Sequence, residues 1–379
     1  MRSDSLDRIV SAAAAPLETA HSLPFEAYTD SSVLDEEMRQ IFAKEWVFVC
    51  MEGELPKAGD YFAMTLANEP VIIIRSEDLT LRAFSNICRH RGTVLLDEGF
   101  GKVDKYITCP YHAWAYDKAG ALKAIPYNKI IAVDRDQHQL TTFQVDVWNG
   151  MVFINLSPDA PPLQERLKGI DELLQLFQPA SFNQTQAGEI EIWQTNWKLA
   201  MENAMESYHL FKVHESTLEA VSPTSDAYYI AGSSEWSLTG GATTGLTGAD
   251  MSDLYNHYIL VQLAPSFVGI LSYGSFAWLS AHPIDTHTTQ IRSGATYLGQ
   301  GMAGRSDDFT KTFFQEDQDI CERVQRGMNS KLSRGGKLVD MERVVVDFHQ
   351  FLASRLGDSQ PSAYFEDDAA SLWRAKGGA

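Results

Sequence analysis

The sequence contains no run of about 18 consecutive apolar residues, the length that a membrane-spanning helix requires. Positive charge is also scarce, because 31 Lys and Arg stand against 50 Asp and Glu, for a formal net charge of −19. A chain of this charge is repelled by nucleic acid and by anionic membranes, so we expect neither as a partner. The apolar stretch near the N-terminus is too short for a secretory signal sequence.

Cysteine is equally rare, with single residues at positions 50, 88, 109 and 321. Four scattered cysteines cannot form a disulfide scaffold in a chain of 379 residues. We therefore expect a reducing, cytoplasmic location, where cysteines with histidine neighbours favour metal chemistry. A G-x-G-x-x-G fingerprint after a strand is also missing, so we expect no dinucleotide site in the chain itself.

The apolar pattern changes near residue 160. Before it, short runs such as "YFAMTL" and "VIIIR" alternate with turn residues, which predicts an antiparallel β domain with hairpins. After "SPDAPP", helical periodicity in "LQERLKGIDELLQLF" and "NWKLAMENAMESYHLF" is mixed with strand-like runs. The fold class is therefore predicted as α+β. We predict an N-terminal segment over 1–40 that packs on the last domain, a β domain over 41–158, and an α+β domain over 159–379.

Two short motifs each combine one cysteine with one histidine. "CRHRG" holds Cys88 and His90, and "CPYHAW" holds Cys109 and His112, with 18 residues between the pairs. Zinc fingers usually pair Cys with Cys and His with His, although a zinc-stabilised module stays open as an alternative. The mixed order is the one that a Rieske cluster needs, since two thiolates hold one iron and two imidazoles the other. The two motifs resemble the Rieske signature C-x-H…C-x2-H, and the resemblance makes these four residues the ligands of a [2Fe-2S] cluster.

A second group of metal-binding residue types occurs in "NWKLAMENAMESYHLFKVH". Glu206, His209 and His214 supply one carboxylate and two imidazoles. On a regular helix the two histidines would lie roughly 140° apart, so we predict that the helix ends or widens between them. Glu206 lies three residues before His209, within hydrogen-bonding reach of that residue.

A third ligand is expected downstream, in "TKTFFQEDQDICERVQRGM". Asp317 falls within the apolar stripe of this predicted helix, whereas Asp319 points to the opposite side and Glu316 to a flank. A carboxylate on a buried helix face is unfavourable unless it is paired or binds a metal. A buried salt bridge remains the alternative explanation for Asp317.

Together the motifs resemble the Rieske non-haem iron oxygenases over about residues 40–330. The resemblance implies an antiparallel β Rieske domain followed by a helix-grip catalytic domain. It also implies a mononuclear iron held by His209, His214 and Asp317, with iron positions left open for dioxygen.

In this family electrons pass from the cluster of one subunit to the iron of its neighbour. Carried over to this chain, the electron path would run from His112 of one subunit to Glu206 and then His209 of the adjacent subunit. The resemblance also implies a homotrimer, with Asn203 as a candidate for support of the active site. The family more often has aspartate at the position of Glu206, and glutamate there resembles its quaternary-amine branch.

The implied activity is that of the terminal oxygenase of a multicomponent system. It would use O2 and electrons from NAD(P)H, delivered by a ferredoxin or reductase, to oxidise a small aromatic or xenobiotic compound. We favour N- or O-dealkylation or monohydroxylation. A cis-dihydroxylating ring dioxygenase and a quaternary-amine monooxygenase are the main alternatives, and a pure electron carrier is a further one.

The segment around the Cys/His motifs is unusually basic. Residues 81–130 contain eight Lys and Arg and four Asp and Glu, which gives a local charge of +4. Arg89 and Arg91 flank His90. We therefore expect this face to bind an acidic electron donor.

Nine aromatic residues between 228 and 278 are expected to divide between the core and the substrate cavity: Tyr228, Tyr229, Trp236, Tyr255, Tyr258, Phe267, Tyr273, Phe276 and Trp278.

Overall fold

The structure, a computed structural model, describes residues 4–233, 235–243, 256–299, 307–357 and 365–366. It forms two compact units, one of residues 42–163 and one of residues 1–41 with 164–379. They are called the smaller and the larger unit below. No helix of the described residues is both long and apolar enough to cross a membrane.

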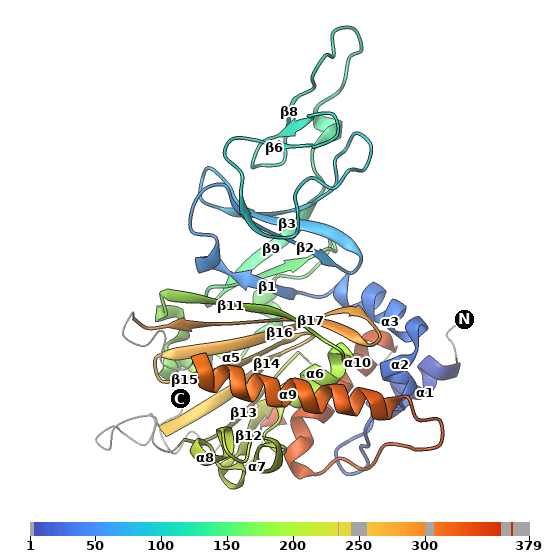
Figure 1. The fold of residues 1–379 in the computed structure, drawn as a ribbon, viewed down its shortest axis with the longest axis vertical. Coiled ribbons are helices and arrows are strands. Elements are labelled where there is room, and N and C mark those ends of the chain that lie inside the picture. The colour runs from blue at the N-terminus through green and yellow to red at the C-terminus, as the bar shows by residue number, and fades with distance from the viewer. Residues whose placement is uncertain (1–3, 234, 244–255, 300–306, 358–364, 367–379) are drawn as a thin grey trace. The chain divides into compact units, whose positions relative to one another are not determined.

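The smaller unit consists of two antiparallel sheets (Figure 1). A seven-stranded sheet has the order β1-β10-β9-β4-β3-β2-β5, and a three-stranded sheet has the order β6-β7-β8. The strands are β1 (Val47–Met51), β2 (Asp60–Leu66), β3 (Glu69–Arg75), β4 (Leu81–Ser85), β5 (Gly99–Lys102), β6 (Ile107–Thr108), β7 (Ala115–Tyr116), β8 (Leu122–Ala124), β9 (Thr142–Trp148) and β10 (Met151–Asn155). Apolar residues of β3, β4 and β6 share one core with Cys88, Cys109 and Trp114.

The larger unit is built on an eight-stranded antiparallel sheet with the order β11-β17-β16-β15-β14-β13-β12-β18. Its strands are β11 (Gln184–Trp193), β12 (Tyr228–Gly232), β13 (Trp236–Ala242), β14 (His257–Leu263), β15 (Phe267–Ser272), β16 (Ser275–Asp285), β17 (Thr288–Tyr297) and β18 (Phe365–Glu366). The α-helices are α1 (Asp4–Ala13), α2 (Glu26–Thr29), α3 (Ser31–Glu37), α4 (Leu163–Arg166, across the boundary), α5 (Ile170–Leu174), α6 (Trp197–Met205), α7 (Leu210–Val213), α8 (Leu218–Val221), α9 (Asp307–Met328) and α10 (Arg343–Leu356). The predicted α+β fold class is confirmed.

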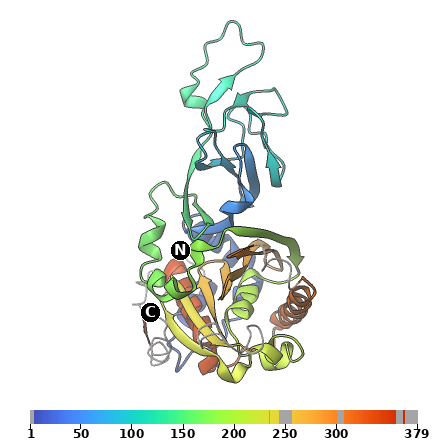
Figure 2. The ribbon, with the colours of Figure 1, turned by 90° about the vertical axis from the view of Figure 1, so that its left-hand side faces the viewer.

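Helix α6 lies between the sheet and α9, as the side view in Figure 2 shows. Asn196 caps its first turn by accepting a hydrogen bond from the Lys198 amide at 3.1 Å. The side chains of Trp197, Ala200, Met201 and Met205 are fully buried, because the helix is covered on more than one side. This arrangement holds the end of α6 beneath α9, where the candidate site lies.

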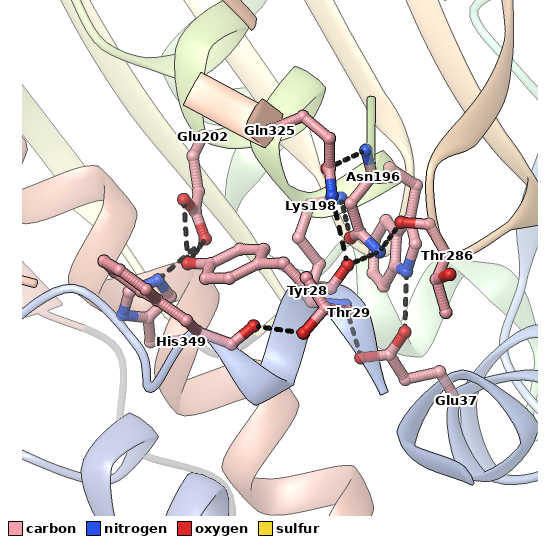
Figure 3. Close-up of polar contacts among 11 residues, drawn as sticks. Tyr28, Thr29, Glu37, Asn196, Lys198, Glu202, Thr286, Gln325 and His349 are labelled. Atoms are coloured by element: carbon pink, nitrogen blue, oxygen red, sulfur yellow. Dashed lines mark hydrogen bonds and ion pairs between the residues drawn. The ribbon is translucent and has the colours of Figure 1, made fainter. Parts of the chain in front are cut away.

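The N-terminal segment is joined to α6 by buried polar groups (Figure 3). The Lys198 ammonium lies 2.7 Å from a Glu37 carboxylate oxygen, and both side chains are 1% exposed. The Trp197 indole donates to the other Glu37 oxygen at 2.8 Å. The Tyr28 hydroxyl donates to Glu202 at 2.8 Å. Residues 26–37 therefore belong to the framework that fixes α6.

Replacing Lys198 by Met should leave the Glu37 carboxylate buried without a counter-charge. We expect this change to lower the free energy of unfolding by about 3–5 kcal/mol, as for other broken buried ion pairs. Urea denaturation followed by circular dichroism measures it. The double variant Lys198→Met with Glu37→Gln should recover part of the loss. Equal stability of the single variant and the wild type would contradict the importance of the pair.

His282 on β16 is a buried histidine for which, among the described residues, no hydrogen-bond partner exists at either ring nitrogen. Burial, with a smaller effect of the Arg292 charge, lowers the pKa of His282 from 6.5 to about 3. Between these values the unfolded chain binds a proton that the folded chain does not. Stability contributed by neutral His282 is therefore present above pH 6.5 and falls with decreasing pH, by at most about 1.4 kcal/mol per pH unit.

We accordingly expect His282→Leu to lose less stability than the wild type between pH 7 and pH 5. Urea midpoints at the two pH values measure the difference. His287→Gln, in the turn between β16 and β17, is the matched control and should retain the wild-type slope. If the stability of His282→Leu depended on pH as steeply as that of the wild type, His282 would bind its proton equally well in the folded and the unfolded chain, which would contradict the lowered pKa.

Candidate active site

The two Cys/His loops of the smaller unit have the same backbone geometry. The carbonyl of Cys88 accepts from the Gly92 amide at 3.0 Å, and that of Cys109 accepts from the Ala113 amide at 3.0 Å. Gly92 and Ala113 both adopt a positive φ, of 74° and 55°. This region is unfavourable for alanine, so the second loop accepts a local cost to form the same turn as the first. The two turns present one cysteine and one histidine each.

The four side chains of these loops divide by exposure. Cys88 and Cys109 are buried at 2% and 3%, and the Cys88 sulfur lies 3.3 Å from the Tyr116 hydroxyl. His90 and His112 are exposed, with ring centroids 4.9 Å apart. The His90 ring stacks on Trp114 at 4.6 Å, which fixes its plane. Buried thiols beside two exposed imidazoles fit a Rieske [2Fe-2S] cluster, whose histidine-bound iron is the outer one.

In the larger unit, helix α6 ends at Met205, before both histidines of the second group. The Glu206 carboxylate accepts hydrogen bonds from the backbone amides of Tyr208 and His209, the latter at 3.1 Å. These bonds stabilise the turn that precedes the one-turn helix α7, and His209 and His214 flank that helix. Helix α6 therefore stops earlier than the sequence predicts, because the Glu206 carboxylate gives the amides of Tyr208 and His209 hydrogen-bond partners outside a helix. His209 and His214 lie at the two ends of α7, where the backbone of His214 has left the helical region (φ −106°, ψ 32°), and their imidazoles face one point.

Three ligand atoms of His209, His214 and Asp317 lie within 4.8 Å of one another. Asp317 Oδ1 is 3.4 Å from Nε2 of His209 and 3.0 Å from Nε2 of His214. The opposite ring nitrogens face other carboxylates: Nδ1 of His209 is 2.6 Å from Glu206, and Nδ1 of His214 is 2.7 Å from Glu316. Each histidine thus has Nδ1 directed at a glutamate and Nε2 directed at Asp317, the arrangement in which a metal could bind both Nε2 atoms and the carboxylate.

The charges of this group are strongly coupled. Burial alone lowers the pKa of His209, but hydrogen bonds to Asp317 and Glu206 raise it to about 10. Burial raises the pKa of Asp317, yet the hydrogen bonds from His209 and His214 give a net decrease. Two imidazoles and one carboxylate within this space fit a divalent iron, which would replace the shared protons.

Two residues beside the triad were not predicted from the sequence. Glu316 lies on the flank of α9, as expected, but this flank faces His214. The Thr217 hydroxyl donates to the same Glu316 oxygen at 2.7 Å and holds the carboxylate in place. The sequence does not distinguish Glu316 from the other acidic residues of this helix. Its contact with His214 depends on where the fold places residues 214–217.

Two cavities meet at Glu206 and His209. One, of about 190 Å³, also contacts His214 and Asp317 and has largely apolar walls that include Tyr258 and Trp278. The other, of about 280 Å³, contains Asn203 and three carboxylates. Of the aromatic residues noted in the sequence, Trp236, Phe267 and Phe276 are core residues, and Tyr255 lies outside the described residues.

Comparison with known proteins identifies the class. Residues 45–143 match the Rieske [2Fe-2S] domain, and residues 181–358 match the catalytic domain of ring-hydroxylating alpha subunits. The chain belongs to the Rieske non-haem iron oxygenases, as its motifs predict. It is the terminal oxygenase component of such a system, an oxidoreductase with a [2Fe-2S] cluster and a mononuclear non-haem iron. Like other members, it receives electrons from partner proteins.

The relatives include the carnitine monooxygenase oxygenase subunit of Escherichia coli (strain K12), 27% identical over 90% of this chain and 95% of the relative. The glycine betaine monooxygenase oxygenase subunit of Chromohalobacter salexigens is 35% identical over 53% of this chain and 45% of that one. The quaternary ammonium Rieske monooxygenase CntA with L-carnitine superimposes with a TM-score of 0.78 at 25% identity, over 92% of this chain and 98% of CntA. Naphthalene 1,2-dioxygenase from Rhodococcus, at 18% identity and a TM-score of 0.76, shares the fold.

Proposed function

We propose that this chain is a monooxygenase that removes an N- or O-alkyl group from a small aromatic compound. The observation that carries the proposal is the apolar cavity that touches His209, His214 and Asp317. Its aromatic side chains, among them Tyr258 and Trp278, suit a flat apolar substrate. A quaternary amine is the second candidate, because carnitine and glycine betaine monooxygenases are among the relatives.

In this proposal His209, His214 and Asp317 hold the iron, and Cys88, His90, Cys109 and His112 hold the cluster. When bound, the two centres supply O2 activation and the electrons for it. Glu206 and Glu316 fix the two imidazoles by accepting hydrogen bonds from Nδ1–H. The apolar walls exclude water and place the alkyl group beside the triad.

We further propose that the protein is a homotrimer in the cytoplasm, in which Glu206 links two subunits. The electron path would run from His112 of one subunit to Glu206 and His209 of the next. Two observations support it: His112 is exposed, and Glu206 contacts both cavities as well as His209. Asn203, in the larger cavity one turn before Glu206, would support the contact between subunits.

The electron donor is proposed to be an acidic ferredoxin or reductase domain that binds the basic face around the cluster. Arg91, Lys102 and Lys105 of this segment are exposed, and the Arg91 guanidinium lies 5.3 Å from the centre of the Tyr111 ring. Reversing these three charges to Glu should slow reduction of the cluster by roughly tenfold at low salt and flatten its dependence on ionic strength.

Stopped-flow absorption of the cluster measures this rate. The matched control is Lys331→Glu, an exposed lysine of the larger unit, which should leave the rate unchanged. If the triple variant is reduced as fast as the wild type, the donor binds elsewhere.

Product identification tests the proposed reaction. The enzyme, reconstituted with a reductase and NADH, is supplied with aryl methyl ethers, N-methylanilines, carnitine and naphthalene. We expect formaldehyde and the dealkylated ring compound. A cis-diol would identify a ring dioxygenase, and turnover of carnitine alone would identify a quaternary-amine monooxygenase; either result would replace the proposed reaction.

A further inference from the structure

The smaller of the two cavities has walls that favour a neutral ligand. Leu260, Val268, Ile270 and Leu279 of the sheet and Phe313 of α9 are among its apolar side chains. A cavity of about 150 Å³ can hold benzene, so about 190 Å³ suits one ring with small substituents. Water has little to bind on such walls, and an apolar ring would displace it.

The charged groups of this cavity are confined to one end. Within the described residues, no lysine or arginine lines it, and its only carboxylates are Glu206 and Asp317. An iron in the triad would add two positive charges, which these two carboxylates already balance. A substrate carboxylate would therefore lose its hydration without gaining a counter-charge.

A cluster of hydroxyl groups forms the polar part of the wall. The Tyr258 hydroxyl lies 3.2 Å from the Ser207 hydroxyl and also contacts Ser222. Burial, more than any other effect, raises the pKa of Tyr258, so its O–H stays neutral and remains a donor. A carbonyl or ether oxygen of a ligand can accept a hydrogen bond from this O–H. A carboxylate would lose more hydration free energy than hydrogen bonds from neutral hydroxyls return.

We infer that the substrate is a small neutral N- or O-alkyl aromatic compound without a carboxylate, with a hydrogen-bond acceptor placed against Tyr258. The inference rests on the proposed dealkylation and adds the charge of the substrate and the residue that orients it. The alkyl group then lies toward the triad, because the acceptor is held by the hydroxyl cluster.

Two ligands of nearly equal size, one neutral and one anionic, test the inference. 4-(Dimethylamino)benzamide is neutral, and 4-(dimethylamino)benzoate differs only in its carboxylate. Their affinities are measured by isothermal titration calorimetry with the enzyme carrying its cluster and iron, without oxygen or reductant. We expect the amide to bind at least about tenfold more tightly than the benzoate. Equal binding, tighter binding of the benzoate, or binding of neither would overturn the inference.

Two variants sharpen the test. Tyr258→Phe should weaken the amide roughly fivefold and leave N,N-dimethylaniline, which lacks the acceptor, unchanged. Ser272→Arg, at the half-buried end of β15 in the cavity wall, should improve binding of the benzoate at least about tenfold over the wild type. An unchanged amide affinity in Tyr258→Phe would remove Tyr258 from the inference. Should the amide bind as expected but give no dealkylated product on turnover, only the proposed function fails.

Discussion

Asp317→Ala is expected to remove the mononuclear iron and to leave the Rieske cluster in place. The reason is geometric: Asp317 is the carboxylate that both Nε2 atoms face, at 3.4 Å from His209 and 3.0 Å from His214. Without it, two imidazoles remain, and both Nδ1 atoms stay committed to glutamates. Substrate turnover should fall by roughly a thousandfold or more, as when a group on which the whole reaction depends is lost.

Iron content and cluster absorption, measured on the same sample, separate the two centres. Asp319→Ala is the matched control, since Asp319 is exposed two residues further along α9 and accepts a hydrogen bond from Gln315. It should keep both iron and activity. An Asp317→Ala protein with a full complement of mononuclear iron would refute the assignment of the triad.

Glu206→Gln is expected to slow electron transfer to the iron more than it weakens iron binding. The Glu206 carboxylate contacts Nδ1 of His209 at 2.6 Å and lies where the two cavities meet. Loss of such an outer carboxylate typically costs 10- to 100-fold in metal affinity or activity, and here we expect turnover to fall by about 100-fold. Reduction of the cluster by its donor should be unaffected.

Single-turnover stopped flow measures the effect as reoxidation of a reduced cluster after mixing with O2 and substrate. Glu202→Gln is the control, because Glu202 lies one turn earlier in the same cavity and binds Tyr28 and His349 instead of the triad. Glu206→Asp should restore part of the rate, since it keeps the charge. Wild-type reoxidation in Glu206→Gln would exclude Glu206 as the bridge between subunits.

The sequence was sufficient for the family and the fold class because both depend on local patterns. The mixed Cys/His loops occupy a few residues each, and the change from period-2 to helical periodicity near residue 160 is visible without contacts. The family and the α+β class are confirmed by the two domain matches. The assignment of individual ligands stays a prediction that the close approach of their side chains supports.

Other parts of the site depend on contacts between distant segments, which periodicity does not encode. The segment "NWKLAMENAMESYHLF" has helical spacing throughout, yet α6 ends at Met205 because Glu206 caps the next turn. Glu316 gains its role only where Thr217 and His214 meet it. Likewise, nothing in "DEEMR" marks Glu37 as the partner of Lys198, 161 residues away.

The coupling of oxygen consumption to dealkylation tests the central claim most directly. The reconstituted enzyme is supplied with 4-(dimethylamino)benzamide, and NADH oxidation, O2 uptake and formaldehyde release are recorded together. We predict one NADH and one O2 consumed for each formaldehyde released, and loss of all substrate-dependent uptake in Asp317→Ala but not in Asp319→Ala. Formaldehyde release that persists in Asp317→Ala, or O2 uptake without any oxidised product in the wild type, would contradict an iron-dependent dealkylating oxygenase.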